Sequence, residues 1–375
     1  MTRRSNIAID VRMLETSGIG TYLQNMVPRV IAARPAFGFV LVGSPPVIER
    51  HGLAQSPNVT VRSCEAPIYS VAEQWRIPAA LPDHTDVYWT PHYPIPVLRR
   101  GPIVVSVHDM LHLAMPELVS GLEKRLYARW MFGHVRRRAT AILFSSQFTA
   151  SEFVRLAGMP RGSPHTIHLG ISESWFRVRT VTRSRERPYL LYVGNVKPHK
   201  NVRALLLAFD AIRDEVPHDL VIVGQREGFI TGDREVNEMA AAHPERVHFT
   251  GVVEGAVLEQ YVASAAALVL PSLYEGFGLP PLEAMACGCP TIVSRAGSLP
   301  EVCGDAALYI DPHDPADLAR AIRALVQQPE LATDLRERGR RQAARFTWDR
   351  CAAQTLPVLD GLTAVAPEAR TRAIR

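Results

Sequence analysis

The chain has 375 residues, of which 47% are hydrophobic, 21% charged and 7% aromatic. This is an ordinary globular composition, and the length is enough for two domains with separate cores, which argues against a single small binding module. No apolar run reaches the roughly 18 to 20 residues that cross a bilayer, and the N-terminus shows no signal-peptide pattern. The sequence therefore predicts a soluble, cytoplasmic protein.

The charge is divided unevenly along the chain. The net charge is +5, but residues 1–187 contain 23 Lys and Arg against 13 Asp and Glu. A basic first half favours an anionic partner such as a lipid surface, and a solvated arginine-rich face is the alternative. We expect no nucleic-acid partner, because no known nucleic-acid-binding motif is visible. Five cysteines show neither a disulfide framework nor a zinc spacing, so no metal site is expected.

In chain order, strand-like and helix-like segments alternate, and the pattern restarts after a charged stretch at residues 178–188. This alternation predicts an α/β architecture with two Rossmann-like halves and mainly parallel sheets. The strands expected in the first half are 6–11, 37–43, 86–90, 102–109 and 139–146. Those expected in the second half are 188–194, 219–224, 246–253, 267–272 and 290–294, with helices at 202–215, 257–265, 280–288 and 314–346.

Three places in the first half could bind a ligand. Gly18 and Gly20 directly precede a helix, where glycines and free amides suit a phosphate, but Leu23 stands where a dinucleotide fingerprint needs glycine. His108 lies at the carboxyl end of a predicted parallel strand, the edge where open α/β sheets bind ligands. His92 and Tyr93 follow another strand of the same half. A tight turn and structural hydrogen bonds are the alternatives for these residues.

The second half contains the more specific segments. Lys197 and Lys200 lie in a turn before a helix, and this placement suits a diphosphate. The sequence has one other lysine, Lys124. Glu275 lies in a glycine-bearing loop, and Glu283 lies in the helix that begins near Pro280. Carboxylates accept hydrogen bonds from vicinal hydroxyls, so the two suggest a ligand with a sugar at both ends of a diphosphate.

With these segments in this order, GIGTY, SVHD, YVGNVKPHKN and YEGFGLPPLEAMACGCPTIVS, the chain resembles the retaining GT-B glycosyltransferases of family 4. It is most similar to bacterial mannosyltransferase-like members acting in O-antigen, capsule or exopolysaccharide assembly. The resemblance implies two Rossmann-like domains facing across a cleft. We expect an acceptor domain at residues 1–177, a nucleotide-sugar domain at 188–345, and a helix at 346–362 that returns to the first domain.

The resemblance also implies roles for individual residues. Lys200 would bind the donor diphosphate, Glu275 the sugar hydroxyls and Glu283 the ribose, while His108 would contact the sugar near its anomeric centre. Further donor contacts would come from Gly18, Gly20, Phe277, Gly278 and Leu279, and the acceptor would lie near His92 and Tyr93. Many members have an arginine where this chain has Asn195, and Lys197 is the candidate for the missing cation.

The resemblance implies transfer of a hexose, with mannose and GDP-mannose as the first choices, to a saccharide linked to a polyprenyl diphosphate. We expect no cofactor and no metal, because lysine and amide dipoles can stabilise the departing diphosphate. A non-hydrolysing nucleotide-sugar epimerase and an inactive nucleotide-sugar-binding subunit are the alternatives. Leu118, Leu122, Leu126 and Trp130 recur at helical spacing beside basic residues, which predicts a peripheral contact with the inner face of the membrane or a core-packed helix.

Overall fold

The computed structural model describes residues 4–118, 121–178, 187–224 and 234–372. The chain forms two compact units: residues Met1–Gly170 with Trp348–Arg375 make the first, and Ile171–Thr347 make the second. The chain thus passes into the second unit ahead of the charged stretch at 178–188, of which residues 179–186 lie outside the described ranges. The helix predicted at 346–362 extends over Trp348–Arg372.

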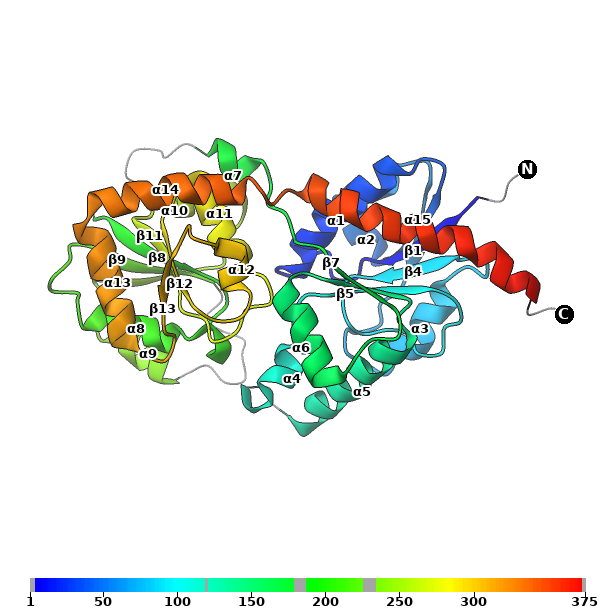
Figure 1. The fold of residues 1–375 in the computed structure, drawn as a ribbon, viewed down its shortest axis with the longest axis horizontal. Coiled ribbons are helices and arrows are strands. Elements are labelled where there is room, and N and C mark those ends of the chain that lie inside the picture. Colours follow the sequence, from blue (N-terminus) through cyan, green and yellow to red (C-terminus); the bar gives the residue numbers. More distant parts are fainter. Residues whose placement is uncertain (1–3, 119–120, 179–186, 225–233, 373–375) are drawn as a thin grey trace. The chain divides into compact units, whose positions relative to one another are not determined.

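The first unit is built on a parallel sheet with the strand order β3-β2-β1-β4-β5-β6-β7 (Figure 1). Its strands are β1 (Asn6–Asp10), β2 (Gly38–Gly43), β3 (Val59–Ser63), β4 (Val87–Thr90), β5 (Ile103–Val107), β6 (Ala141–Phe144) and β7 (Ser163–Thr166). Its helices are α1 (Ile19–Ala33), α2 (Pro45–Arg50), η1 (Leu53–Gln55), α3 (Glu73–Ala80), α4 (Leu111–Ala114), η2 (Pro116–Leu118), α5 (Leu122–Arg138), α6 (Gln147–Ala157) and α15 (Trp348–Arg372).

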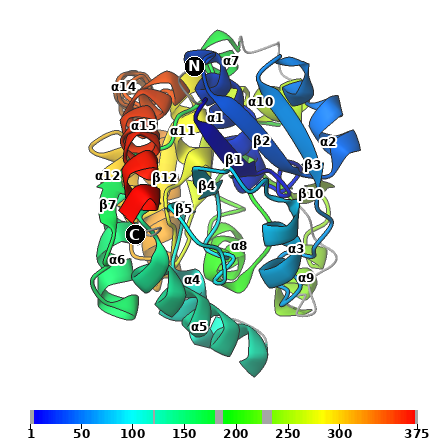
Figure 2. The ribbon, with the colours of Figure 1, turned by 90° about the vertical axis from the view of Figure 1, so that its right-hand side faces the viewer.

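The central strands of this sheet are mostly apolar and buried, since helices cover both faces. Strands β4, β5 and β6 are buried at every position. On one side α15 runs along α1, as Figure 1 shows in red and blue, and the ion pairs Arg29–Asp349 and Arg34–Asp360 join the two helices. Figure 2 shows α4 and α5 next to each other at the periphery of this unit.

The second unit repeats the architecture with the strand order β10-β9-β8-β11-β12-β13, again all parallel. Its strands are β8 (Tyr189–Val193), β9 (Asp219–Val223), β10 (Val247–Gly251), β11 (Ala267–Leu270), β12 (Thr291–Ser294) and β13 (Leu308–Ile310). Its helices are α7 (Ser174–Arg177), η3 (Pro198–Lys200), α8 (Val202–Asp210), α9 (Arg234–Ala241), α10 (Gly255–Ala263), α11 (Leu279–Cys287), α12 (Leu299–Cys303), α13 (Pro315–Gln327) and α14 (Pro329–Ala343).

The ten strands predicted from the sequence are confirmed, but the structure adds three more. Strands β3, β7 and β13 lie at sheet edges. The segment predicted as helical at 314–346 is not one helix but two, α13 and α14, which meet at Gln328 and Pro329. A proline is well placed in a first helical turn but interrupts the helix before it. Leu118 belongs to η2 and not to the helix that contains Leu122, Leu126 and Trp130.

Candidate functional site

Each sheet has a switch point, the place where the strand order changes direction. In the first unit it lies between β1 and β4, and in the second between β8 and β11. Loops that leave the carboxyl ends of such strands diverge, and open α/β sheets bind ligands there. Most of the residues singled out from the sequence lie in these loops.

In the second unit the structure brings Lys200 and Glu275 together. Lys200 ends η3 after β8, Glu275 lies in the loop after β11, and Nζ of Lys200 is 2.7 Å from Oε1 of Glu275. The same Oε1 atom accepts a hydrogen bond of 2.7 Å from the Ser272 hydroxyl. Glu275 is 8% exposed and Ser272 is fully buried. Both bonds go to one oxygen, so Oε2 keeps its lone pairs for another donor.

The turn that presents Lys200 is fixed to the neighbouring loops by the Asn201 side chain and the His199 carbonyl. Asn201 adopts a left-handed conformation with φ of 56°, which asparagine tolerates better than most residues. Its side-chain Nδ2 atom donates to the carbonyl oxygens of Pro271 and Pro312, at 3.1 and 2.7 Å. The Leu273 N–H donates to the carbonyl of His199. These bonds hold the lysine turn against the Glu275 loop.

A third loop, after β12, supports the backbone of Glu275. The Ser298 N–H and hydroxyl both donate to the Glu275 carbonyl, and the hydroxyl also lies 2.7 Å from the carbonyl of Phe277. Gly297 has φ of 61°, and a Cβ there would lie 2.4 Å from the Glu275 oxygen. Ser272, Gly297 and Ser298 were not predicted from the sequence. The signal that could have indicated Ser272 is its position three residues before Glu275.

Helix α11 begins at the end of the loop after β11, which also contains Glu275. Gly278, with φ of 107°, occupies its N-cap, Leu279 is its first residue, and Phe277 is 5% exposed. Pro280 and Pro281 have no N–H, so the amides left at this helix start are those near Gly278 and Leu279. The resemblance implies backbone contacts of this segment to a donor, and that role stays a prediction.

Glu283 lies further along α11 and has an unusual environment. Burial, with a smaller contribution from the nearby Glu259 carboxylate, raises the pKa of Glu283 to about 7. A carboxyl group in this state is sensitive to small changes of pH near neutrality. Glu283 is therefore a carboxyl group that titrates near neutral pH, on the helix that follows Glu275 in the chain.

Asn195 and Lys197 lie between β8 and η3. The Asn195 carbonyl accepts a hydrogen bond from the Tyr192 hydroxyl, and the Lys197 carbonyl accepts one from the Lys200 N–H. Both side chains are half-buried. Lys197 and Lys200 thus share one turn, as the sequence predicts.

In the first unit, His108 directly follows β5 and packs against α1. Its ring lies edge-on to Tyr22, with centroids 4.9 Å apart. Burial lowers the pKa of His108 to about 4, against smaller opposing effects of Asp109 and a backbone hydrogen bond to Pro91, so the imidazole is neutral at pH 7. Its Nε2 atom is buried and has no hydrogen-bond partner among the described residues.

The two glycines before α1 differ in their surroundings. Gly18 has φ of 73°, and a Cβ there would meet no atom within 4 Å. A Cβ on Gly20 would lie 2.6 Å from the Leu14 carbonyl oxygen, so this glycine is needed for the first turn of α1 to pack on the preceding loop. Tyr22, two residues later, contacts His108, which places this turn in the neighbourhood of that histidine.

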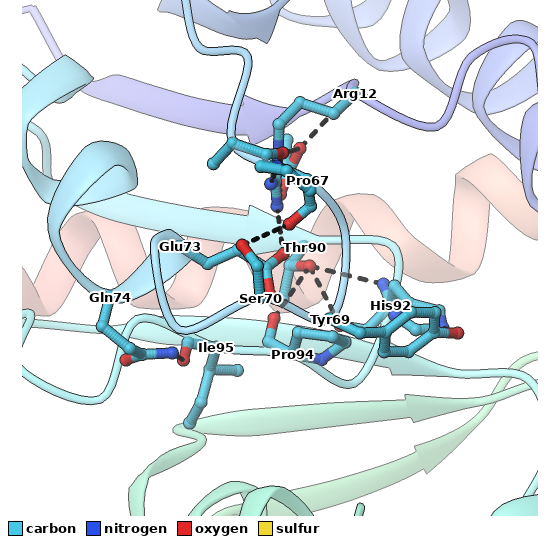
Figure 3. Close-up of polar contacts among 12 residues, drawn as sticks. Arg12, Pro67, Tyr69, Ser70, Glu73, Gln74, Thr90, His92, Pro94 and Ile95 are labelled. Atoms are coloured by element: carbon cyan, nitrogen blue, oxygen red, sulfur yellow. Dashed lines mark hydrogen bonds and ion pairs between the residues drawn. The ribbon is translucent and has the colours of Figure 1, made fainter. Parts of the chain in front are cut away.

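A small recess at the switch point of the first unit was not predicted. It is lined by Asp10, Arg12, Met13, Ile68, Glu73, Thr90, Pro91, His92 and Pro94. Figure 3 shows Arg12, from the loop after β1, pointing toward Glu73 at the start of α3. The Arg12 guanidinium binds Asp10 at 2.7 Å and Glu73 at 2.8 Å, and its side chain is 6% exposed.

His92 lies on this recess, and Tyr93 packs beside it. The Tyr93 ring stacks on Phe132 with centroids 4.4 Å apart, so it belongs to the core. The Nε2 atom of His92 is 2.8 Å from the Tyr69 hydroxyl, and its Nδ1 atom is buried without a partner among the described side chains. Tyr69 has φ of 64°, a strained value for a residue with a side chain. Tyr69, Arg12 and Glu73 were not predicted from the sequence as site residues.

Within the described ranges, no three His, Cys, Asp or Glu side chains gather in a way that could hold a metal ion. No helix in those ranges combines the length and apolar character needed to cross a bilayer.

Two family models match the chain, one after the other. The model described as "Glycosyltransferase Family 4" matches residues 16–175, and that described as "Glycosyl transferases group 1" matches residues 176–342. A similar relative is the O-antigen chain mannosyltransferase B of Escherichia coli, which is 29% identical over 91% of this chain and 95% of its own.

Among solved structures, sucrose-phosphate synthase from Thermosynechococcus elongatus superposes with a TM-score of 0.79 at 21% identity, over 96% of this chain and all of the other. HepE of Anabaena, solved in complex with UDP-glucose, gives a TM-score of 0.74 at 17% identity, over 95% of this chain and 99% of its own. These likenesses show a GT-B fold.

Proposed function

The chain belongs to family 4 of the glycosyltransferases, and we propose that it transfers mannose, with retention of configuration, from a nucleotide-diphospho-sugar to a lipid-linked saccharide in surface polysaccharide synthesis. The observation that carries the proposal is the Lys200–Glu275 pair at the switch point of the second unit. The choice of mannose and of polysaccharide synthesis is supported by the likeness to the E. coli O-antigen mannosyltransferase. GDP-mannose is the first donor to test.

The residues of the second unit suit the donor half of this reaction. Glycosyl transfer builds positive charge at the anomeric carbon and negative charge on the departing diphosphate, and groups fixed in advance stabilise that charge best. Lys200 is such a cation, and the amides of Gly278 and Leu279 are fixed dipoles at a helix start. Oε2 of Glu275 can accept hydrogen bonds from sugar hydroxyls, and ionised Glu283 can accept them from a ribose.

In the first unit, His108 would serve as a neutral hydrogen-bonding group beside the sugar and not as a permanent cation, because its pKa is lowered. The Gly18–Gly20 turn, Asn195 and Lys197 remain proposed donor contacts on the strength of the family resemblance. His92 remains the proposed acceptor residue, and Tyr93 is proposed to support it, since its ring packs on Phe132. Transfer is proposed to need no metal.

The experiment is an NMR assay of the full chain with GDP-mannose and a mannoside acceptor, in excess EDTA and in its absence. The proposal expects a new α-mannosidic anomeric signal in both samples. A donor whose sugar changes configuration without acceptor would identify an epimerase. Loss of transfer on chelation, restored by magnesium, would overturn the metal-independent step alone.

We further propose that the first unit docks on an anionic membrane through α5. Leu122, Leu126 and Trp130 recur every four residues along this helix and are 68%, 58% and 45% exposed. Lys124 and Arg129 are also exposed on α5. Exposed apolar and basic side chains on one helix favour a surface that offers hydrocarbon and negative charge together.

A further inference from the structure

The positive charge of the recess in the first unit, that of Arg12, is already paired with two carboxylates. Arg12 is the one arginine or lysine among the described residues that line it. Its Nε and Nη2 atoms both bind the carboxylate of Asp10, Nη2 also binds Glu73, and Nη1 binds the carbonyl of Ala66 at 2.9 Å. The edge of the guanidinium that would grip a phosphate in bidentate fashion is therefore occupied by Asp10.

The two carboxylates are held in turn by tyrosines. The Tyr88 hydroxyl donates to Oδ2 of Asp10 at 3.1 Å, and the Tyr127 hydroxyl donates to Oε2 of Glu73 at 3.2 Å. Oδ1 of Asp10 accepts two hydrogen bonds and Oδ2 accepts three, whereas each oxygen of Glu73 accepts one. Glu73 therefore keeps accepting capacity for a group that brings its own proton.

His92 adds a second position of the same kind. Burial is the main cause of a pKa well below the usual histidine value, and the neighbouring histidines and Arg12 lower it further. A neutral imidazole has one donor and one acceptor nitrogen, and Nε2 already pairs with the Tyr69 hydroxyl. Nδ1 can therefore pair with a hydroxyl group whether or not this nitrogen carries the proton, because a hydroxyl both donates and accepts. A phosphate dianion only accepts, so it can pair with Nδ1 only when Nδ1 carries the proton.

The walls of the recess are fixed, so it cannot easily rearrange its charges. Gln74, buried beside Glu73, donates to the carbonyl of Ile95 at 3.0 Å and accepts from the Val97 N–H at 2.8 Å. Arg12 joins the loop after β1 to Ala66 and α3 through the bonds given above. A phosphate would have to enter an anionic recess whose cation is committed, at a large desolvation cost.

We propose that this recess receives an uncharged hydroxyl-bearing end of the acceptor saccharide and discriminates against a phosphorylated one. This inference rests on the proposed function, because it assigns the chemical class of the acceptor of that reaction. Asp10, Arg12 and Glu73 set the charge, and Glu73 with His92 forms the hydrogen bonds.

The test measures binding without catalysis. Saturation-transfer NMR on the full-length protein compares methyl α-D-mannopyranoside with mannose 6-phosphate, and glucose with glucose 6-phosphate, at equal concentrations and pH 7.5. We expect the neutral sugar of each pair to give a signal at least fivefold stronger. Glu73→Gln should reduce this ratio toward one, and Glu65→Gln, which removes an exposed acid from the adjoining loop, should leave it unchanged.

Equal or stronger signals from the phosphorylated sugars with the wild-type protein would overturn the inference, even if Glu73→Gln fails to fold. So would the absence of signal from every sugar while thermal shift shows that GDP-mannose binds. Failure of the proposed function is distinguishable, because it appears as failure of donor binding or of transfer, both measured without reference to the recess.

Discussion

Lys200 and Glu275, which lie 75 positions apart in the chain, form one ion pair through Nζ and Oε1 at 2.7 Å. The family resemblance implies separate tasks for them, Lys200 at the diphosphate and Glu275 at the sugar. Their contact means that each is the electrostatic partner of the other before any ligand binds. A substitution at either residue therefore affects stability as well as chemistry.

We predict that Lys200→Ala lowers kcat by roughly 10² to 10³, the usual effect of removing one preorganised charge-stabilising donor. It should also destabilise the fold by about 1 to 3 kcal/mol, because the buried Glu275 carboxylate loses its cation. Adding Glu275→Gln should restore the melting temperature without restoring activity. A double variant that melts as low as Lys200→Ala would contradict the pairing as the cause.

We predict that Ser272→Ala lowers kcat/KM about tenfold through the orientation of Glu275. One hydrogen bond to a charged group contributes roughly 1.5 kcal/mol, and Lys200 alone cannot fix both rotations of the carboxylate. Ser272→Thr keeps the hydroxyl and should retain more activity than Ser272→Ala. Steady-state kinetics at equal melting temperature would check this, and equal impairment of the two variants would reject the positioning role.

The raised pKa of Glu283 predicts a pH-dependent stability. Its pKa in the folded protein is about 7, above the ordinary value of 4.5 that applies to the unfolded chain. Between these values the folded state binds more protons, so the contribution of Glu283 to stability is present at low pH and is lost as pH rises through about 7.

Thermal melts at pH 5, 6, 7 and 8 test this contribution. Glu283→Gln should melt higher than the wild type at pH 8 and show a smaller decline between pH 5 and 8. Asp305→Asn, at an exposed acid of the same unit, serves as control. Parallel curves for the wild type and Glu283→Gln would show that Glu283 does not titrate in this range.

We predict that the protein sediments with vesicles containing phosphatidylglycerol and is released by roughly 0.5 M salt, which screens charge. Lys124→Glu with Arg129→Glu should abolish sedimentation, and so should Leu126→Ser with Trp130→Ser. Arg62→Glu with Arg341→Glu changes the net charge equally at exposed sites outside α5 and should have no effect.

Arg136, Arg137 and Arg138 are less suitable for this test, because Arg138 donates to the carbonyl of Arg99 at 2.7 Å and Arg136 packs on Gly158. Binding to neutral vesicles of equal strength, or to neither kind, would instead indicate that α5 presents a solvated face.

The parts of the fold that could be predicted are those whose burial is visible locally. Central strands such as β5 are buried at every position and mostly apolar, since both faces are covered. Edge strands β3 and β7 are largely exposed, with sequences VTVRS and SPHT, and so lack a continuous apolar run. They are held by pairing with a neighbour, which a local pattern does not encode.

The same distinction applies to the site. Glu275 and Lys200 could be found because each lies in a distinctive short segment. Arg12 and Glu73 could not, since they are 61 positions apart and neither segment is unusual by itself. Their pairing depends on the order of strands β1 and β4, which brings the loop after β1 and the start of α3 to one edge of the sheet.

The return of α15 to the first unit also determines the order in which the chain can fold during synthesis. Trp348, the first residue of α15, contacts Tyr22, which in turn contacts His108. The second unit is continuous from Ile171 to Thr347, whereas the first requires segments on both sides of it. At the usual rates of translation, the ribosome takes on the order of ten to forty seconds to pass from one segment to the other. The earlier half of the chain therefore lacks its final helix throughout the synthesis of the later half.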